Sequence, residues 1–117
     1  IGSGLVGSEM CIRDRFEWVI ENLCKNAVDA MGGVGVLVIS VQETSRYWCI
    51  DVADTGKGID KRYFETVFAP GYTTKKRGWG LGLSLARRIV VEYHSGSIFV
   101  KQSEINKGTI FRIELKK

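Results

Sequence analysis

The stretch Lys75-Lys76-Arg77-Gly78-Trp79-Gly80-Leu81-Gly82-Leu83 runs three cations into three alternating glycines, and an apolar helical pattern begins where the glycines stop. Glycine permits a positive φ and a close approach of other groups to the backbone. A helix start adds unpaired N–H groups and the positive end of a dipole. The junction therefore suits an oligophosphate, although a flexible loop with solvated charges before an ordinary amphipathic helix explains it equally well.

Length and composition limit the possible functions of the chain. Its 117 residues are enough for one hydrophobic core but not for two. No apolar run approaches the roughly 20 residues that span a bilayer. The net charge of +4 is compatible with an anionic ligand and too diffuse along the chain to argue for nucleic acid. We therefore expect one globular domain with no nucleic-acid partner and no direct membrane contact.

The cysteines and the single histidine give no metal site. Cys11, Cys24 and Cys49 are widely spaced, with no pair at metal-binding spacing. We infer a reducing, cytosolic compartment. His94 ends a helical pattern just before Gly96, as a helix C-terminal residue does before a glycine stop.

The N-terminal residues do not match the pattern of the rest of the chain. Residues 1–12 have no sustained period and contain three glycines. We interpret residues 1–13 as a foreign or disordered leader and assign the functional domain to residues 14–117. A native edge strand is the alternative interpretation of the leader.

A helix is predicted from Asp14 to Met31, followed by the stop signal Gly32-Gly33. At ~100° per residue, its polar residues fall on one face opposite an apolar stripe. These polar residues are Asn22, Lys25, Asn26 and Asp29. A solvated helix face would explain them, but asparagine is a poor helix former, and two asparagines one turn apart suggest a function.

The remaining pattern predicts an α+β fold. We predict strands at 34–42, 47–52, 97–102 and 109–115, a short helix within 60–68 and a long helix at 83–93. The order helix-strand-strand-helix-strand-strand favours an antiparallel-rich sheet that is covered by helices on one face.

A nucleotide with a hard metal ion would use all of the polar features. Asp54, directly after a strand, could accept a hydrogen bond from an exocyclic amine, which adenine carries and guanine lacks on the equivalent carbon. Gly56 and Gly58 would let a base lie against bare backbone. Asn26 could give Mg²⁺ an oxygen ligand, with phosphates and waters completing the octahedron. Lys75 and the N–H groups of the glycine-rich loop would neutralise the outer phosphates.

Five stretches resemble, in the right order, the boxes of histidine kinases. Glu21–Ala27 resembles the N box, Asp54–Gly58 the G1 box, Phe64–Phe68 the F box, Gly78–Leu83 the G2 box, and Gly108-Thr109 the third glycine element. Each box alone is weak evidence, and the five together cover almost everything outside the leader. The chain resembles the catalytic and ATP-binding domain of a two-component sensor histidine kinase, a member of the GHKL or Bergerat-fold superfamily.

The resemblance implies a Bergerat-type two-layer sandwich. Its sheet is mixed but mostly antiparallel, packs on about three helices and carries a mobile ATP lid. The residues implied to contact ATP are Asn22, Lys25, Asn26, Asp29, Asp54, Gly56, Gly58, Ile59, Phe68, Thr73, Thr74, Lys75, Gly78, Gly80, Leu81, Gly82, Leu83 and Thr109.

Individual roles follow by position. Asn26 would coordinate Mg²⁺ with support from Asn22, Asp54 would read the adenine amino group, and Thr109 would bond near it through water. Phe64 and Phe68 would anchor the lid or belong simply to the core.

Two positions depart from the pattern of the family. Trp79 stands where the G2 box more often holds a small or polar residue. The segment before Asp14 does not resemble the strands that usually open this domain, and without them the sheet would have an exposed edge.

The kinase interpretation competes with two others. ATP-hydrolysing relatives of the gyrase and HSP90 kind carry a glutamate four residues before the metal-binding asparagine, as the base for the attacking water. Asn22 stands at that position here and cannot take a proton, while Glu21 lies ~100° further round the helix and points away from Asn26. The sequence thus favours a protein-histidine kinase over a GHKL-type ATPase or a degenerate nucleotide-binding module.

The acceptor of the phosphoryl group is expected on another domain. In the family, the acceptor histidine lies on a separate helical hairpin and is followed by an acidic residue, whereas His94 is followed by Ser95-Gly96. The implied partners are the dimerisation and histidine-phosphotransfer helices of the parent kinase and a downstream response regulator. The isolated domain is expected to be a cytoplasmic monomer, whether or not the parent is anchored in a membrane.

Overall fold

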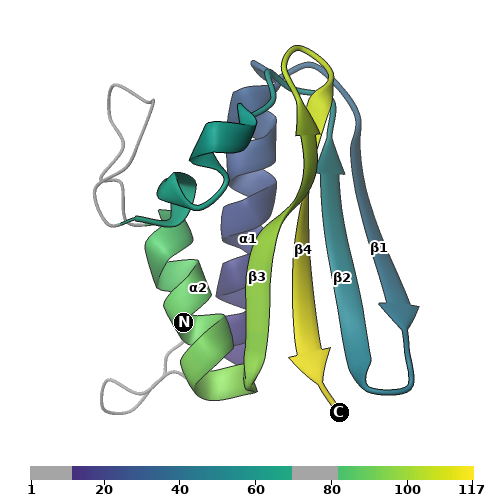
Figure 1. Cartoon of the computed structure of the whole chain (residues 1–117), viewed down its shortest axis with the longest axis vertical. Helices are drawn as coiled ribbons and strands as arrows, with labels where there is room; N and C mark the ends of the chain where they lie inside the picture. The colour runs from purple at the N-terminus through teal and green to yellow at the C-terminus, as the bar shows by residue number, and fades with distance from the viewer. Residues whose placement is uncertain (1–11, 70–81) are drawn as a thin grey trace.

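The computed structural model of the chain describes residues 12–69 and 82–117. Its elements are α1 (Ile12–Ala30), β1 (Leu37–Glu43), β2 (Tyr47–Asp54), the 3₁₀ turns η1 (Lys61–Tyr63) and η2 (Thr66–Phe68), α2 (Gly82–His94), β3 (Gly96–Glu104) and β4 (Gly108–Lys116). The strands form one sheet in the order β1-β2-β4-β3. Figure 1 shows α1 and α2 together on one face of this sheet, which confirms the two-layer α+β prediction.

The described part is simpler than the resemblance implied. Every strand pair in it is antiparallel, so the mixed character expected of the sheet is not found among these residues. Two α-helices and two single 3₁₀ turns stand in place of about three helices. The predicted lid, including Trp79, and the N-terminal residues 1–11 lie outside the described residues.

The helix α1 forms because an apolar residue recurs every turn on the side that faces the sheet. Val19, Leu23 and Ala27 are buried at successive i, i+4 positions. The helix ends where Gly32 and Gly33 take positive φ, and the Gly33 N–H donates to the Val28 carbonyl at 3.0 Å. Because α1 begins at Ile12, its first two residues precede the domain boundary predicted at residue 14.

The core lies between the helices and the inner face of the sheet. The most deeply buried large side chains are Val19, Leu23, Val52, Val90, Ile98 and Ile113, which come from both helices and three strands.

Cys49 is also buried and Cys24 half-buried, and both are free thiols. Burial, together with the charge of Glu21, raises the pKa of the Cys24 thiol. Both cysteines thus behave as small apolar residues, as their positions in the sequence predict.

The sheet has an inner face against the helices and an open outer face. Along β4, Thr109, Phe111 and Ile113 are buried and alternate with half-buried residues. Since successive side chains point to opposite faces of a strand, the buried set points toward the helices. Asp54 pairs directly with Thr109 across β2 and β4. These two polar residues therefore share the inner face at one end of the sheet.

Two strands run two residues further at their C-terminal ends than the sequence predicts. β2 continues to Asp54 rather than Val52, and β3 continues to Glu104 rather than Gln102. The added residues are small or polar and have weak strand propensity, but each pairs with a neighbour in the ladder. A register shift between Val100 and Gln102 changes which side chains of β3 face inward.

None of the helices in the described residues is both long and apolar enough to cross a membrane.

Candidate functional site

Asp54 is the buried polar residue on which the candidate site is centred. It is 8% exposed and ends β2 on the inner face of the sheet. Its carboxylate accepts hydrogen bonds from the backbone N–H groups of Gly56, at 2.8 Å, and of Thr109. Burial raises the pKa of Asp54, and the two hydrogen bonds partly oppose this shift. The structure thus fixes an acceptor where the sequence predicts recognition of an amino group.

The glycines after Asp54 are required by contacts within the chain. A Cβ on Gly56 would lie 2.7 Å from the carbonyl carbon and oxygen of Ala30, and the next N–H, of Lys57, donates to that oxygen at 3.1 Å. Gly58 has φ +78°, and a Cβ there would collide with the carbonyl oxygen of Glu104. The turn is therefore held between the end of α1 and the β3–β4 turn. That these glycines also border a base stays a prediction.

The polar face of α1 lies beside the start of α2. Asn22 and Asn26 are half-buried, whereas Lys25 and Asp29 are exposed. A Cβ on Gly82, the first residue of α2, would lie 2.6 Å from the Asn22 Oδ1 atom. The structure thus brings the predicted N box next to the last glycine of the predicted G2 box. Figure 1 shows the C-terminal end of α1, the end of β2 and the start of β4 at the same end of the molecule.

Phe68 belongs to the hydrophobic core. It is 4% exposed and meets Phe111 edge to face, with ring centroids 6.1 Å apart. The guanidinium carbon of Arg87 lies 4.7 Å from the centroid of its ring. Phe64 is half-buried against the same core. These positions support the alternative that the two phenylalanines are core residues, and contact of Phe68 with a nucleotide stays a prediction.

Ile59 and Leu83 are half-buried and pack against the core. The other predicted contacts, namely Thr73, Thr74, Lys75, Gly78, Gly80 and Leu81, lie outside the described residues.

Ser103 is a polar residue of this end of the sheet that the sequence analysis missed. Its Oγ atom accepts a hydrogen bond from the Ile59 N–H at 2.7 Å and lies 2.8 Å from the Thr109 Oγ1 atom. It also donates to the Gly108 carbonyl at 3.0 Å. The predicted strand ended at Gln102. If the predicted strand had been continued toward the turn at 105–107, the hairpin register would have placed Ser103 opposite Thr109.

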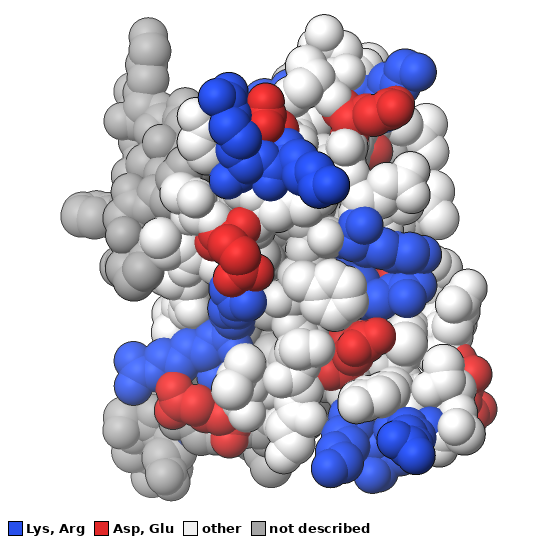
Figure 2. Space-filling model, in the orientation of Figure 1, with Lys and Arg blue, Asp and Glu red and all other residues white. Residues whose placement is uncertain are grey.

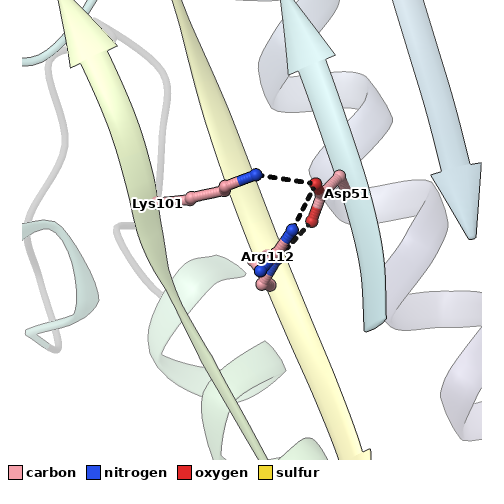
Figure 3. A network of polar contacts seen from close by, with 3 residues as sticks. All are labelled: Asp51, Lys101 and Arg112. Carbon is pink, nitrogen blue, oxygen red and sulfur yellow. Dashed lines mark hydrogen bonds and ion pairs between the residues drawn. The ribbon is translucent and has the colours of Figure 1, made fainter. Parts of the chain in front are cut away.

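A second polar cluster lies on the outer face of the sheet (Figure 3). The Asp51 carboxylate accepts hydrogen bonds from Arg112, at 2.7 and 2.9 Å, and lies 3.5 Å from the Lys101 Nζ atom. These bonds hold the pKa of Asp51 below its usual range. Asp51, Lys101 and Arg112 come from three different strands, so the cluster ties β2, β3 and β4 together. A separate hollow of about 180 Å³ is lined by residues of β2, of β4 and of the end of β3, with Asp54 and Thr109 among them.

The residues present fit a nucleotide with Mg²⁺. The described residues contain no cluster of three or more His, Cys, Asp or Glu that could hold a metal ion. A Mg²⁺ ion at the half-buried Asn26 would therefore take most of its ligands from phosphate and water, which is how this ion is usually held in nucleotide sites.

On the face shown in Figure 2, Lys and Arg occur in separate groups with Asp and Glu between them. The basic residues drawn in colour on this face therefore form no continuous stripe.

Comparison with known proteins identifies the family. A family model described as "Histidine kinase-, DNA gyrase B-, and HSP90-like ATPase" matches residues 11–117. Sporulation kinase D of Bacillus subtilis (strain 168) is 38% identical over 105 residues, which are 90% of this chain and 20% of that protein. Sensor histidine kinase ZraS of Escherichia coli (strain K12) is 40% identical over 102 residues, 87% of this chain and 22% of that protein. The chain thus spans about a fifth of the length of these relatives.

Solved structures agree with this assignment. The nucleotide-free catalytic domain of histidine kinase ThkA superimposes with a TM-score of 0.78 at 33% identity, covering 90% of this chain and 69% of that one. ThkA in complex with the response regulator protein TrrA matches with a TM-score of 0.75 at 31% identity, covering 90% of this chain and 29% of that one. The chain belongs to the family of histidine kinase-, DNA gyrase B-, and HSP90-like ATPases, and its fold is that of the catalytic domain of a histidine kinase.

Proposed function

We propose that the chain binds Mg-ATP and delivers the γ-phosphoryl group to a histidine on a separate dimerisation domain. The observation that carries the proposal is the buried Asp54 carboxylate, held as an acceptor beside Thr109 and close to the end of α1. A buried carboxylate with a raised pKa costs stability, which is typical of a residue kept for binding rather than for folding.

Each part of the site has a role in this function. Asp54 accepts a hydrogen bond from the adenine amino group, and Asn26 offers its side-chain oxygen to Mg²⁺. Asn22, beside the first residue of α2, supports the phosphate end of the nucleotide. Bound Mg²⁺ supplies charge neutralisation for the transferred phosphoryl group. Phosphoryl transfer depends mostly on such positioning and charge neutralisation, so this domain needs no nucleophile of its own.

The acceptor histidine is proposed to lie outside this chain. His94, the single histidine, is the last residue of α2, and Ser95 after it takes φ +49° before β3 begins. An acceptor in the middle of an accessible helix is therefore absent from the described residues. We propose that the dimerisation helices of the parent kinase supply it and that this domain alone is monomeric and turns over slowly.

The proposed partner downstream is a response regulator, and the proposed location is the cytoplasm. Support comes from the ThkA structure, which contains the response regulator protein TrrA. The relatives named above are a sporulation kinase and a sensor histidine kinase. The chain is about a fifth as long as these relatives, so we propose that the acceptor histidine lies in a part of the parent kinase outside this chain.

Calorimetric titration of the 117-residue chain with ATP and GTP, each with and without Mg²⁺, tests the proposal. We expect micromolar binding that is selective for adenine, sensitive to Mg²⁺ and unaccompanied by hydrolysis. Brisk release of inorganic phosphate would contradict the proposal in favour of a hydrolase, which needs a base that Asn22 does not provide. A folded chain that binds neither nucleotide would contradict it altogether.

A further inference from the structure

The Ser103 hydroxyl group lies among three polar groups at the floor of the candidate site. It receives the Ile59 N–H at 2.7 Å, donates to the Gly108 carbonyl at 3.0 Å and contacts the Thr109 hydroxyl at 2.8 Å. Ile59 belongs to the turn that follows Asp54, whereas Thr109 belongs to β4. Ser103 therefore connects the two segments that border the carboxylate.

A count of protons and lone pairs favours one direction for the bond between the two hydroxyl groups. A serine hydroxyl has one proton and two lone pairs. The proton of Ser103 goes to the Gly108 carbonyl, which can only accept, and one lone pair takes the Ile59 N–H. The geometry at 2.8 Å allows either hydroxyl to donate, and donation by Thr109 to the remaining lone pair of Ser103 is the one arrangement in which all three contacts are hydrogen bonds. With its proton used in this way, the Thr109 oxygen can only accept from any further partner.

We propose that Ser103 is a positioning residue for base specificity, because it holds the Thr109 hydroxyl in the orientation that leaves its oxygen an acceptor. The inference rests on the proposed function and adds a selectivity element to it. Asp54 pairs with Thr109 in the ladder, so the two acceptors lie side by side on the inner face. An ionised carboxylate also accepts only.

Two neighbouring acceptors discriminate between purines by the group at carbon 6. Adenine presents an amino group there, which can donate to either oxygen directly or through a water molecule. Hypoxanthine presents a carbonyl, which finds no donor at this position while Thr109 is held by Ser103. Without Ser103, the Thr109 hydroxyl could turn and donate to that carbonyl. Removal of the serine hydroxyl should thus relax selectivity between ATP and inosine triphosphate.

The test compares the affinities of ATP and inosine triphosphate by calorimetry on the full chain. In Ser103→Ala, the ratio of the ATP affinity to the inosine triphosphate affinity should fall about fivefold, the value of one ordinary hydrogen bond. Ser103→Thr, which keeps a hydroxyl, should restore the wild-type ratio. Ser97→Ala, on the exposed start of the same strand, serves as the matched control and should leave the ratio unchanged.

A double-mutant comparison separates positioning from general damage. If Ser103 acts through Thr109, Ser103→Ala should not alter the ratio further once Thr109→Val has removed the second hydroxyl. An unchanged ratio in a folded Ser103→Ala variant, or an equal fall in the Thr109→Val background, would overturn the inference while leaving ATP binding by the wild type intact. Failure of the wild type to bind ATP would instead overturn the proposed function and this inference together.

Nuclear magnetic resonance of the unaltered, nucleotide-free chain gives an answer that depends on no variant. We expect a slowly exchanging hydroxyl proton on Thr109 with close contacts to the β-protons of Ser103. A slowly exchanging Ser103 proton directed at the Thr109 oxygen would show the opposite bond direction and would overturn the inference.

Discussion

Asp51 and Asp54 lie three residues apart on one strand, and their surroundings shift their acidities in opposite directions. Asp51, on the outer face, is bound by Arg112 and Lys101, which hold its pKa below the usual value. Asp54, on the inner face, accepts from the backbone N–H groups of Gly56 and Thr109, and burial raises its pKa. The first residue contributes to stability in its charged form, and the second costs stability in its charged form.

This difference predicts opposite pH dependences for two matched variants. Asp51→Asn should lower the free energy of unfolding by about 2 kcal/mol at pH 7, because it removes a charged partner of Arg112. Because the pKa of Asp51 is lower in the folded state than in the unfolded state, the ion pair contributes its full stability at pH values above the unfolded-state pKa of about 3.9. This stability is lost as the pH falls through the folded-state pKa. Asp54→Asn should have no such loss, because burial of the charge already costs the wild type stability at pH 7.

Urea denaturation at several pH values measures both effects. The stability gap between the wild type and Asp51→Asn should shrink as the solution becomes acidic. For Asp54→Asn, any advantage of the variant at pH 7 should disappear as the pH falls through the raised pKa of Asp54, where the wild-type carboxyl becomes neutral. A gap for Asp51→Asn that stays constant down to acidic pH would contradict the assigned ion pair.

At the scale of elements, the turn after β2 joins the polar end of the sheet to α1. Its two glycines are each in contact with backbone of another element, Gly56 with Ala30 and Gly58 with Glu104. The turn therefore positions Asp54 relative to α1 through backbone contacts that no side chain could replace.

Replacement of Gly58 by alanine tests this packing. Gly58 has φ +78° and its new Cβ would collide with the Glu104 carbonyl, so we expect a loss of about 3 kcal/mol in the free energy of unfolding. Gly32→Ala is the control, because Gly32 has φ +67° but no atom within 4 Å of the added carbon. This control should lose about 1 kcal/mol of stability, because alanine is strained in the left-handed conformation but meets no other atom there. Equal losses would show that the collision is relieved cheaply.

Arg87 joins α2 to the segment before residue 70. It makes two hydrogen bonds to Glu65, at 2.9 and 3.2 Å, and lies over the ring of Phe68. Arg87→Lys should lower stability by about 1 kcal/mol, because lysine loses both the planar fork and the stacking.

The matched control is Arg88→Lys, since Arg88 forms an exposed pair with Glu92 on the same helix. This substitution should cost about 0.3 kcal/mol in urea denaturation. A loss for Arg87→Lys no larger than that of the control would contradict the stabilising role of the contact.

At the scale of the whole molecule, local patterns predict more than long-range pairings do. The periodicity of α1 and its polar face, the element order and the turn after Asp54 all depend on neighbouring residues, and the structure confirms them. The cluster of Asp51, Lys101 and Arg112 joins residues up to 61 positions apart, and single charges within strands carry no local sign of such pairing. Ser103 was missed for the same reason, because its partners depend on a hairpin register and a register shift.

In the described part of the chain, β1 and β3 are the two edge strands of the sheet. The residues of β1 from Val38 to Glu43 are all exposed. The helices cover the centre of the sheet, where Val52 and Ile113 are fully buried, and leave this edge uncovered. The candidate site lies on the inner face of the sheet, at the end where α1 and β2 finish and β4 begins.

The central claim is that Asp54 recognises the adenine amino group, and ATP binding by Asp54→Asn tests it most directly. Calorimetry should show ATP binding roughly 30-fold weaker than in the wild type, the loss of one hydrogen bond to a charged group, with the fold intact by circular dichroism. Asp51→Asn, on the same strand but the outer face, should bind ATP like the wild type under conditions where it is folded. Unchanged ATP affinity in Asp54→Asn would contradict the account.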